Sequence, residues 1–162
     1  MGRVNKILIS EKHSYAKHKM GEPGNFPMHE IDSVECIEGR GLKGDRYFEK
    51  NEGHKGQVTF ISFEKHLELM SFLGKEFDYK IYRRNIFVTG IDPFELIGKK
   101  FKVNDVEFLG VEDCAPCRWM EETIGSGTYD WMSKNKSGGL RAKVLNSGLI
   151  KLNDIIVLEK SI

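Results

Sequence analysis

Apolar residues in this chain fall into short segments separated by glycines and polar residues, a spacing typical of many short strands. Some segments alternate apolar and polar residues and others are rich in β-branched and aromatic residues, and both patterns favour strands. The predicted strands are Val4–Ser10, Val34–Glu38, Gln57–Ser62, Asn85–Thr89 and Val106–Glu112. Two pairs, Asn104-Asp105 and Asn153-Asp154, lie between apolar arms and predict hairpin turns, because Asn and Asp tolerate left-handed conformations.

Three segments predict helices. The segment that begins at Phe63 has apolar residues at the i, i+4, i+7 spacing of an amphipathic helix and should end at Gly74. Pro116–Ile124 and Thr128–Lys136 also have helical spacing, whereas Tyr15–His29 predicts one long surface loop. Because strands dominate and do not alternate regularly with helices, we expect one mainly β domain over residues 1–162. Its sheet should be an antiparallel barrel, closed or partly open, with two or three small helices outside it.

Charge and composition exclude several classes of protein. The 162 residues include 25 Lys and Arg against 24 Asp and Glu, so the net charge of +1 argues against a nucleic-acid-binding protein. No apolar run is long enough to span a bilayer, and Met1–Ser10 lacks the apolar stretch of a signal peptide. The odd count of three cysteines argues against a disulfide framework, so we expect a cytoplasmic protein with reduced thiols.

The first candidate site is the glycine-rich segment Gly39–Gly44, which fits G-x-G-x-x-G. A dinucleotide-binding fold requires a helix directly after this motif, and the residues from Asp45 onward lack an apolar helical stripe. We therefore reject that fold. Two interpretations remain open: a turn between strands, or an anion-binding loop surrounded by Arg40, Lys43 and Arg46.

The second candidate is the C-x-x-C segment Cys114–Cys117. A structural zinc site needs four ligands, and no second ligand pair has the required spacing. A thioredoxin-like dithiol would lie at a strand-to-helix junction, as this motif does, but it also needs βαβ organisation, whereas hairpins are predicted here. A thiol oxidoreductase with a reversible Cys114–Cys117 disulfide remains a further alternative. The third interpretation is a reactive thiolate for a soft metal or for sulfur chemistry, since Cys117 opens a predicted helix beside Arg118. Two buried, inert cysteines are the alternative.

Two further segments carry groups that suit an anion. Arg83 and Arg84 enter a predicted strand, and an extended backbone points them to opposite faces. The pair Gly138-Gly139 allows backbone to approach a ligand closely, and Arg141 follows it. Each is also compatible with an ordinary strand end or loop. Taken together with the cysteines, they suit a phosphate-bearing cofactor with a soft-metal centre.

In this order, the motifs resemble those of the MOSC domain family, named after the molybdenum cofactor sulfurase C-terminal region. The similar segments are Glu38–Arg46, Gln57–Ser62, Arg83–Ile91, Ile97–Val103, Cys114–Cys117, Gly138–Ala142 and Ile150–Val157. The resemblance extends from roughly Val4 to Leu158. It departs from the family at Asn104 and Asn153, where relatives often have glycine.

The resemblance implies a β-barrel of the MOSC type and a role with the molybdenum cofactor. In better-understood relatives a cysteine thiolate ligates molybdenum, and those proteins reduce N-hydroxylated compounds. Cys117 corresponds to that ligand, with Cys114 as the second catalytic candidate. The expected cofactor-binding residues are Lys43, Gly44, Asp45, Arg46, Arg83, Arg84, Asn85, Arg118, Gly138, Gly139 and Arg141.

The family offers an alternative function, a sulfur-carrier or cofactor-delivery module with a persulfide on Cys114 or Cys117. We expect a small-molecule substrate or a sulfur donor and, for an oxidoreductase, a partner reductase, because the sequence shows no flavin or iron–sulfur signature. Pyridoxal phosphate is not expected, since it belongs to a separate aminotransferase-like domain of the sulfurases. Neither nucleic acid nor a membrane is an expected partner.

Overall fold

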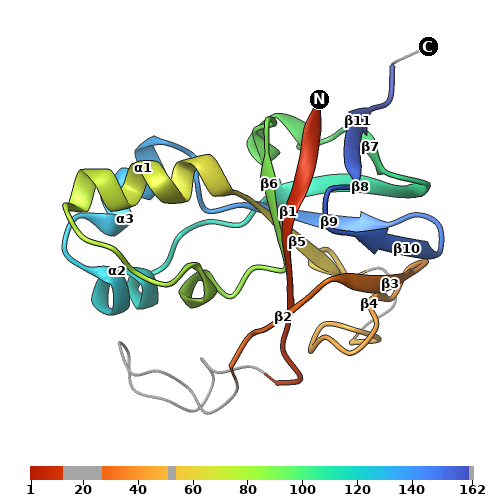
Figure 1. Ribbon diagram of the computed structural model, residues 1–162, viewed down its shortest axis with the longest axis horizontal. Coiled ribbons are helices and arrows are strands. Elements are labelled where there is room, and N and C mark those ends of the chain that lie inside the picture. The colour runs from red at the N-terminus through yellow and green to blue at the C-terminus, as the bar shows by residue number, and fades with distance from the viewer. Residues whose placement is uncertain (13–26, 51–53, 161–162) are drawn as a thin grey trace.

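The computed structural model describes residues 1–12, 27–50 and 54–160. Seven strands form a closed barrel in which each strand pairs with the next and the last pairs with the first (Figure 1). In spatial order these strands are β1 (Gly2–Ile9), β6 (Ile86–Thr89), β5 (Val58–Ser62), β9 (Leu140–Val144), β8 (Val106–Asp113), β7 (Lys100–Val103) and β11 (Ile155–Leu158). The predicted mainly β barrel is confirmed.

Further short strands extend this framework. Strand β2 (His29–Ile31) pairs with β1 outside the closed barrel. A second sheet consists of β10 (Gly148–Lys151), β3 (Ser33–Ile37) and β4 (Gly41–Leu42). Strand β4 lies inside the glycine-rich segment, and residues 43–50 directly after it form turns rather than a helix, so the rejection of a dinucleotide fold is confirmed. Most of the predicted loop Tyr15–His29 lies outside the described residues, and its last residue begins β2.

One pair of barrel strands is parallel rather than antiparallel. Strands β5 and β6 run in the same direction, and the chain between them contains α1 (Phe63–Leu73) and the 3-10 helix η1 (Tyr79–Tyr82). A parallel pair needs such a crossover, because a tight turn joins only antiparallel strands. The Ser62 side chain caps α1 by accepting the N–H of Lys65 at 3.2 Å, and Gly74 ends it in a left-handed conformation, as predicted.

The remaining helices are α2 (Arg118–Ile124), α3 (Thr128–Lys134) and the 3-10 helix η2 (Pro93–Leu96). Helices α1, α2 and α3 gather on one side of the barrel (Figure 1). None of the helices in the described residues is long and apolar enough to cross a membrane.

The second predicted hairpin is wrong. Asn153-Asp154 does form a turn, in which Lys151 donates its backbone N–H to the Asp154 carboxylate at 2.7 Å. The two arms, however, pair with strands of different sheets: β10 with β3, and β11 with β7 and β1. The first hairpin, at Asn104-Asp105, does join paired arms, β7 and β8.

Two apolar clusters hold the barrel and the helices together. The first fills the barrel and includes Phe60, Phe101 and Phe108, all fully buried. The second lies between the barrel wall and the helices and includes Ile61, Phe87 and Met120. Strand β5 is buried on both faces, which explains why its sequence is rich in β-branched and aromatic residues rather than alternating with charged ones.

Candidate functional site

A cavity of about 330 Å³ brings together four separate parts of the sequence. They are the segment that follows the glycine-rich loop, the Arg83-Arg84 pair before β6, the cysteine segment after β8, and one residue of β9. The lining residues are Arg46, Tyr47, Lys50, His54, Gly56, Thr59, Arg83, Arg84, Cys114, Ala115, Cys117 and Arg141. Six of these were predicted from sequence as site residues: Arg46, Arg83, Arg84, Cys114, Cys117 and Arg141.

Among the described residues, the cavity lining carries five Lys or Arg side chains and no carboxylate. Glu112 lies next to it and pairs with Arg141 at 3.3 Å and with Lys55 at 3.7 Å, both at partly exposed positions. Burial lowers the pKa of the Arg141 guanidinium, but its hydrogen bond to the Cys114 side chain and the charge of Glu112 raise it by more, so that this pKa lies above its ordinary value. A concave surface with one sign of charge attracts ligands of the opposite sign, so the cavity suits an anion.

Arg84 ties the cysteine segment to the barrel. It is buried and donates from Nε to the Gly138 carbonyl at 2.9 Å and from Nη2 to the Cys114 carbonyl at 3.4 Å. A third bond runs from Nη1 to the Tyr82 carbonyl at 2.9 Å. Glycine is required at 138, because a Cβ there would lie 2.1 Å from the Cys114 carbonyl oxygen. The second predicted glycine, Gly139, faces a smaller neighbouring cavity of about 150 Å³.

Asp45 and Arg46 form a buried ion pair at 3.2 Å, with side chains 0% and 2% exposed. The Asp45 carboxylate also accepts the backbone N–H of Ser10 at 3.0 Å and that of Tyr47 at 3.3 Å. Arg46 donates to the Arg83 carbonyl at 2.8 Å and lines the cavity. Asp45 is therefore placed to hold Arg46, and is not itself among the cavity-lining residues.

The side chains of Arg83 and Asn85 connect β-strand segments. Arg83 has a positive φ of 55° and donates to the Ser10 hydroxyl at 3.1 Å and to the Lys12 carbonyl at 2.9 Å. Asn85 is fully buried, where its side chain accepts the backbone N–H of Thr59 at 3.1 Å and donates to the Leu8 carbonyl at 3.1 Å. Asn85 thus joins strands in the barrel wall and does not line the cavity.

The three cysteines lie in different environments. Cys36 lies in the barrel core, where burial raises the pKa of its thiol to about 12. Cys114 is buried at the end of β8 and lines the cavity, while Cys117 is exposed, also lines the cavity, and precedes the seven-residue helix α2. The arrangement leaves Cys117 as the thiol that solvent and ligands reach most easily.

Three predicted residues lie elsewhere. Lys43 is exposed and pairs with Glu35 at 3.4 Å on the second sheet, with Gly44 directly after it. Arg118 is exposed, and none of the three is among the residues that line the cavity. In the described part of the chain no cluster of three or more His, Cys, Asp or Glu side chains is arranged to hold a metal ion, so nothing there supports the zinc interpretation.

Sequence reasoning missed the aromatic and basic group Tyr47, Lys50 and His54. The rings of Tyr47 and His54 stack with centroids 6.1 Å apart, and Lys50 Nζ lies 5.5 Å from the Tyr47 ring centroid. Burial, together with the charges of Lys50 and Arg141, lowers the pKa of His54 below its ordinary value. These residues belong to no motif, and only their position after the glycine-rich segment hinted at a role.

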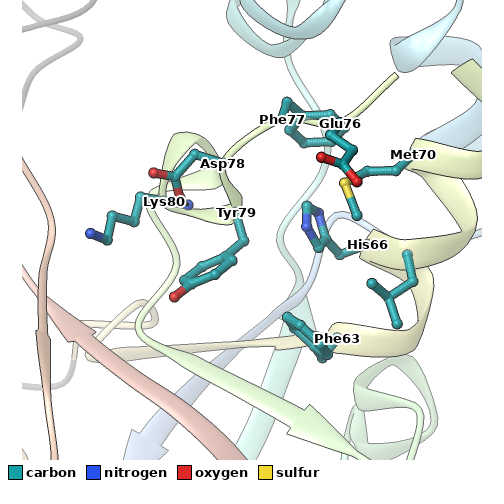
Figure 2. A pocket seen from close by; sticks show the side chains of 9 residues that line it. Phe63, His66, Met70, Glu76, Phe77, Asp78, Tyr79 and Lys80 are labelled. Carbon is teal, nitrogen blue, oxygen red and sulfur yellow. Dashed lines mark hydrogen bonds between the residues drawn. The ribbon is translucent and has the colours of Figure 1, made fainter. Parts of the chain in front are cut away.

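A second cavity, of about 550 Å³, lies between α1 and the segment 76–80 (Figure 2). Aromatic side chains line it, including Phe63, His66 and Tyr79. His66 Nδ1 lies 3.0 Å from the Tyr82 hydroxyl, and burial lowers the pKa of that imidazole. The rings pack against one another, with the His66 centroid 5.7 Å from that of Phe63. This cavity contains none of the predicted site residues.

The fold and the site together define a small barrel with a basic, thiol-bearing cavity. The model of the MOSC domain family matches residues 48–157, and the chain therefore belongs to that family. The match begins after the glycine-rich segment and includes Cys117. No curated protein matches the sequence.

Several solved structures share the fold. The crystal structure of YiiM from Geobacillus stearothermophilus matches with a TM-score of 0.72 and 11% identity, over 99% of this chain and 76% of that chain. The YuaD protein from Bacillus subtilis matches with a TM-score of 0.72 and 16% identity, over 99% and 98%. YiiM from Escherichia coli matches with a TM-score of 0.68 and 14% identity, over 99% and 71%. At these identities the likeness supports the barrel fold alone.

Proposed function

We propose that this protein is a molybdenum-cofactor-dependent oxidoreductase that reduces N-hydroxylated compounds, with Cys117 as the thiolate that ligates molybdenum. One observation carries the proposal: an exposed thiol borders a cavity whose described lining residues include five Lys or Arg side chains and no carboxylate. Membership of the MOSC domain family supplies the link to this cofactor.

The residues present fit such a cofactor chemically. Thiolates are preferred ligands of soft metals, and guanidinium groups bind phosphate oxygens in bidentate geometry. Both donor types border the same cavity, with Cys117 and Arg141 among its lining residues. When bound, the cofactor would supply a metal centre that exchanges two electrons with the substrate.

The protein itself would bind and orient the cofactor and neutralise its negative charge. Its arginines would neutralise the anionic cofactor, and the tie between Arg84 and the cysteine segment would fix the segment that carries the ligating thiol. Reduction of an N–O bond consumes two electrons and two protons and releases water. The reaction therefore needs a source of electrons for the molybdenum centre, and a partner reductase would provide them.

The test measures molybdenum per protein by elemental mass spectrometry after incubation with molybdenum cofactor. We expect near-stoichiometric metal in the wild type and at least a tenfold loss in Cys117→Ser, since a hydroxyl is a poor ligand for a soft metal. Cys36→Ser is the matched control, because that thiol lies in the core away from the cavity. Equal metal content in the wild type and Cys117→Ser would disprove the assignment of the ligand.

A second candidate function is a sulfur carrier that holds a persulfide on Cys117 or Cys114. The observation that favours it is that both thiols border one cavity, where Arg141 donates a hydrogen bond to the Cys114 side chain and can stabilise an anionic sulfur. After exposure to a cysteine desulfurase and free cysteine, mass spectrometry should show an adduct of about 32 Da that a thiol reductant removes. An unchanged mass under these conditions would rule the carrier out.

A further inference from the structure

The basic side chains of the cavity differ in how many of their donors are already engaged. Arg84 donates to three backbone carbonyls, at 2.9, 2.9 and 3.4 Å. Arg46 donates to the Asp45 carboxylate and to the Arg83 carbonyl. Arg83 donates to the Ser10 hydroxyl and to the Lys12 carbonyl. These arginines build the cavity wall and give it positive potential, but much of their directional hydrogen bonding serves the protein itself.

Lys50, His54 and Arg141 have fewer of their hydrogen-bond donors engaged within the protein. Within the described residues, the Lys50 ammonium has neither an ion pair nor a hydrogen bond, and contacts only the face of the Tyr47 ring. The His54 Nδ1 atom accepts the backbone N–H of Gly56 at 3.0 Å, so the neutral ring carries its proton on Nε2. Arg141 pairs with Glu112 through Nη1 at 3.3 Å and interacts with the Cys114 side chain, and its own side chain remains 45% exposed.

Local packing holds these three groups together. The Tyr47 ring stacks on His54 and carries the Lys50 ammonium over its face. Gly56 lies between His54 and Arg141: a Cβ at this position would be 3.3 Å from His54 Cε1 and 3.7 Å from Arg141 Cδ. The missing side chain therefore lets the imidazole and the guanidinium stem approach from two sides.

We propose that Lys50, His54 and Arg141 form the subsite that binds the terminal phosphate group of the anionic ligand, while the buried arginines shape the wall behind it. This inference rests on the proposed function for the identity of the whole ligand, but not for the chemistry of the subsite. A phosphate dianion offers oxygens to all three donors, and it supplies a counter-charge that the described lining residues do not.

The subsite should bind the phosphate group together with a proton. In the described part of the chain, the charged or titratable groups near His54 are Tyr47, Lys50 and Lys55 on its own segment, Arg141 on β9, and Glu112, which pairs with both Arg141 and Lys55. Without a ligand, burial and the two cations keep the pKa of His54 low, so the ring is neutral at neutral pH. A bound dianion favours the imidazolium and raises that pKa. Affinity should therefore rise as pH falls through the pKa of His54 in the complex.

Isothermal titration calorimetry with phenyl phosphate tests the subsite without molybdenum. We expect Lys50→Met, His54→Gln and Arg141→Gln each to weaken binding about tenfold or more, the usual cost of one charge-assisted hydrogen bond. Lys50→Arg should restore most of the affinity. Lys99→Met, an exposed lysine outside the cavity, is the control and should bind as the wild type does. Thermal melts confirm that each variant is folded.

The titration and the metal assay separate two failures. If the wild type binds phenyl phosphate and the three variants bind it equally well, the subsite is wrong, whatever the molybdenum content of Cys117→Ser. Absence of binding to the wild type also overturns the subsite. If instead the subsite variants lose affinity while the wild type takes up no molybdenum, the subsite stands and the proposed function fails. His54→Gln should also abolish the rise of affinity with falling pH, measured above about pH 7, where a phosphate monoester remains mostly a dianion.

Discussion

Replacement of Asp45 by asparagine should lower the free energy of unfolding by about 3–5 kcal/mol, because it leaves a buried guanidinium without its counter-charge. The Asp45 and Arg46 side chains are 0% and 2% exposed, so water cannot replace the lost partner. Asparagine has nearly the same shape, but one of its two side-chain ends becomes a donor. The Ser10 N–H binds one carboxylate oxygen and the Tyr47 N–H binds the other, so asparagine can accept only one of these two backbone groups.

The same loop offers a matched control for this change. Glu49 pairs with Arg40 at the surface, where the two side chains are 52% and 59% exposed. Glu49→Gln should cost less than about 1 kcal/mol, because solvent screens an exposed pair. Urea denaturation of the wild type and both variants gives the comparison. Similar losses for Asp45→Asn and Glu49→Gln would contradict the view that burial makes the first pair important.

The strand pattern was sufficient for the barrel but not for every connection within it. Alternation of apolar and polar residues predicted the strand Val106–Glu112, and enrichment in β-branched and aromatic residues predicted the strand Gln57–Ser62, because strands buried on one or both faces have these patterns. The turn at Asn153-Asp154 shows the limit of such reasoning. Turn chemistry fixes the local conformation, but whether the arms then pair depends on distant partners, here β3 for one arm and β7 for the other.

The site was predictable to the extent that its residue types are distinctive. Cys117 belongs to a motif, and the cavity does contain it. Asp45 and Asn85 are polar residues beside glycines and arginines, as ligand-binding residues often are, yet both are buried and bonded within the protein. Sequence does not reveal burial of a polar side chain. Lys50 and His54 were missed because they belong to no motif, and only the folded chain brings them to the cavity that contains the cysteine segment.

Phe60→Ala should also lower the free energy of unfolding by about 3–5 kcal/mol, the usual cost of removing a fully buried phenyl ring. The Phe60 ring is at the centre of the barrel, where its centroid lies 5.2 Å from those of Phe101 and Phe108 in edge-to-face geometry. All three rings are fully buried, so the barrel strands around them leave little freedom to collapse onto the space that alanine would create.

Phe72→Ala removes the same side chain from the surface and separates burial from residue type. Phe72 is 58% exposed and only stacks on Trp131 at 6.1 Å, so we expect a cost of about 1 kcal/mol or less. Phe60 directly follows the cavity residue Thr59, and the Phe60 carbonyl oxygen would lie 2.6 Å from a Cβ placed on Gly139. Phe60→Ala should therefore also weaken ligand binding at the cavity. Urea denaturation measures the first effect and phenyl phosphate affinity the second. A cost for Phe60→Ala no greater than that for Phe72→Ala would show that the three rings do not form the stabilising core of the barrel.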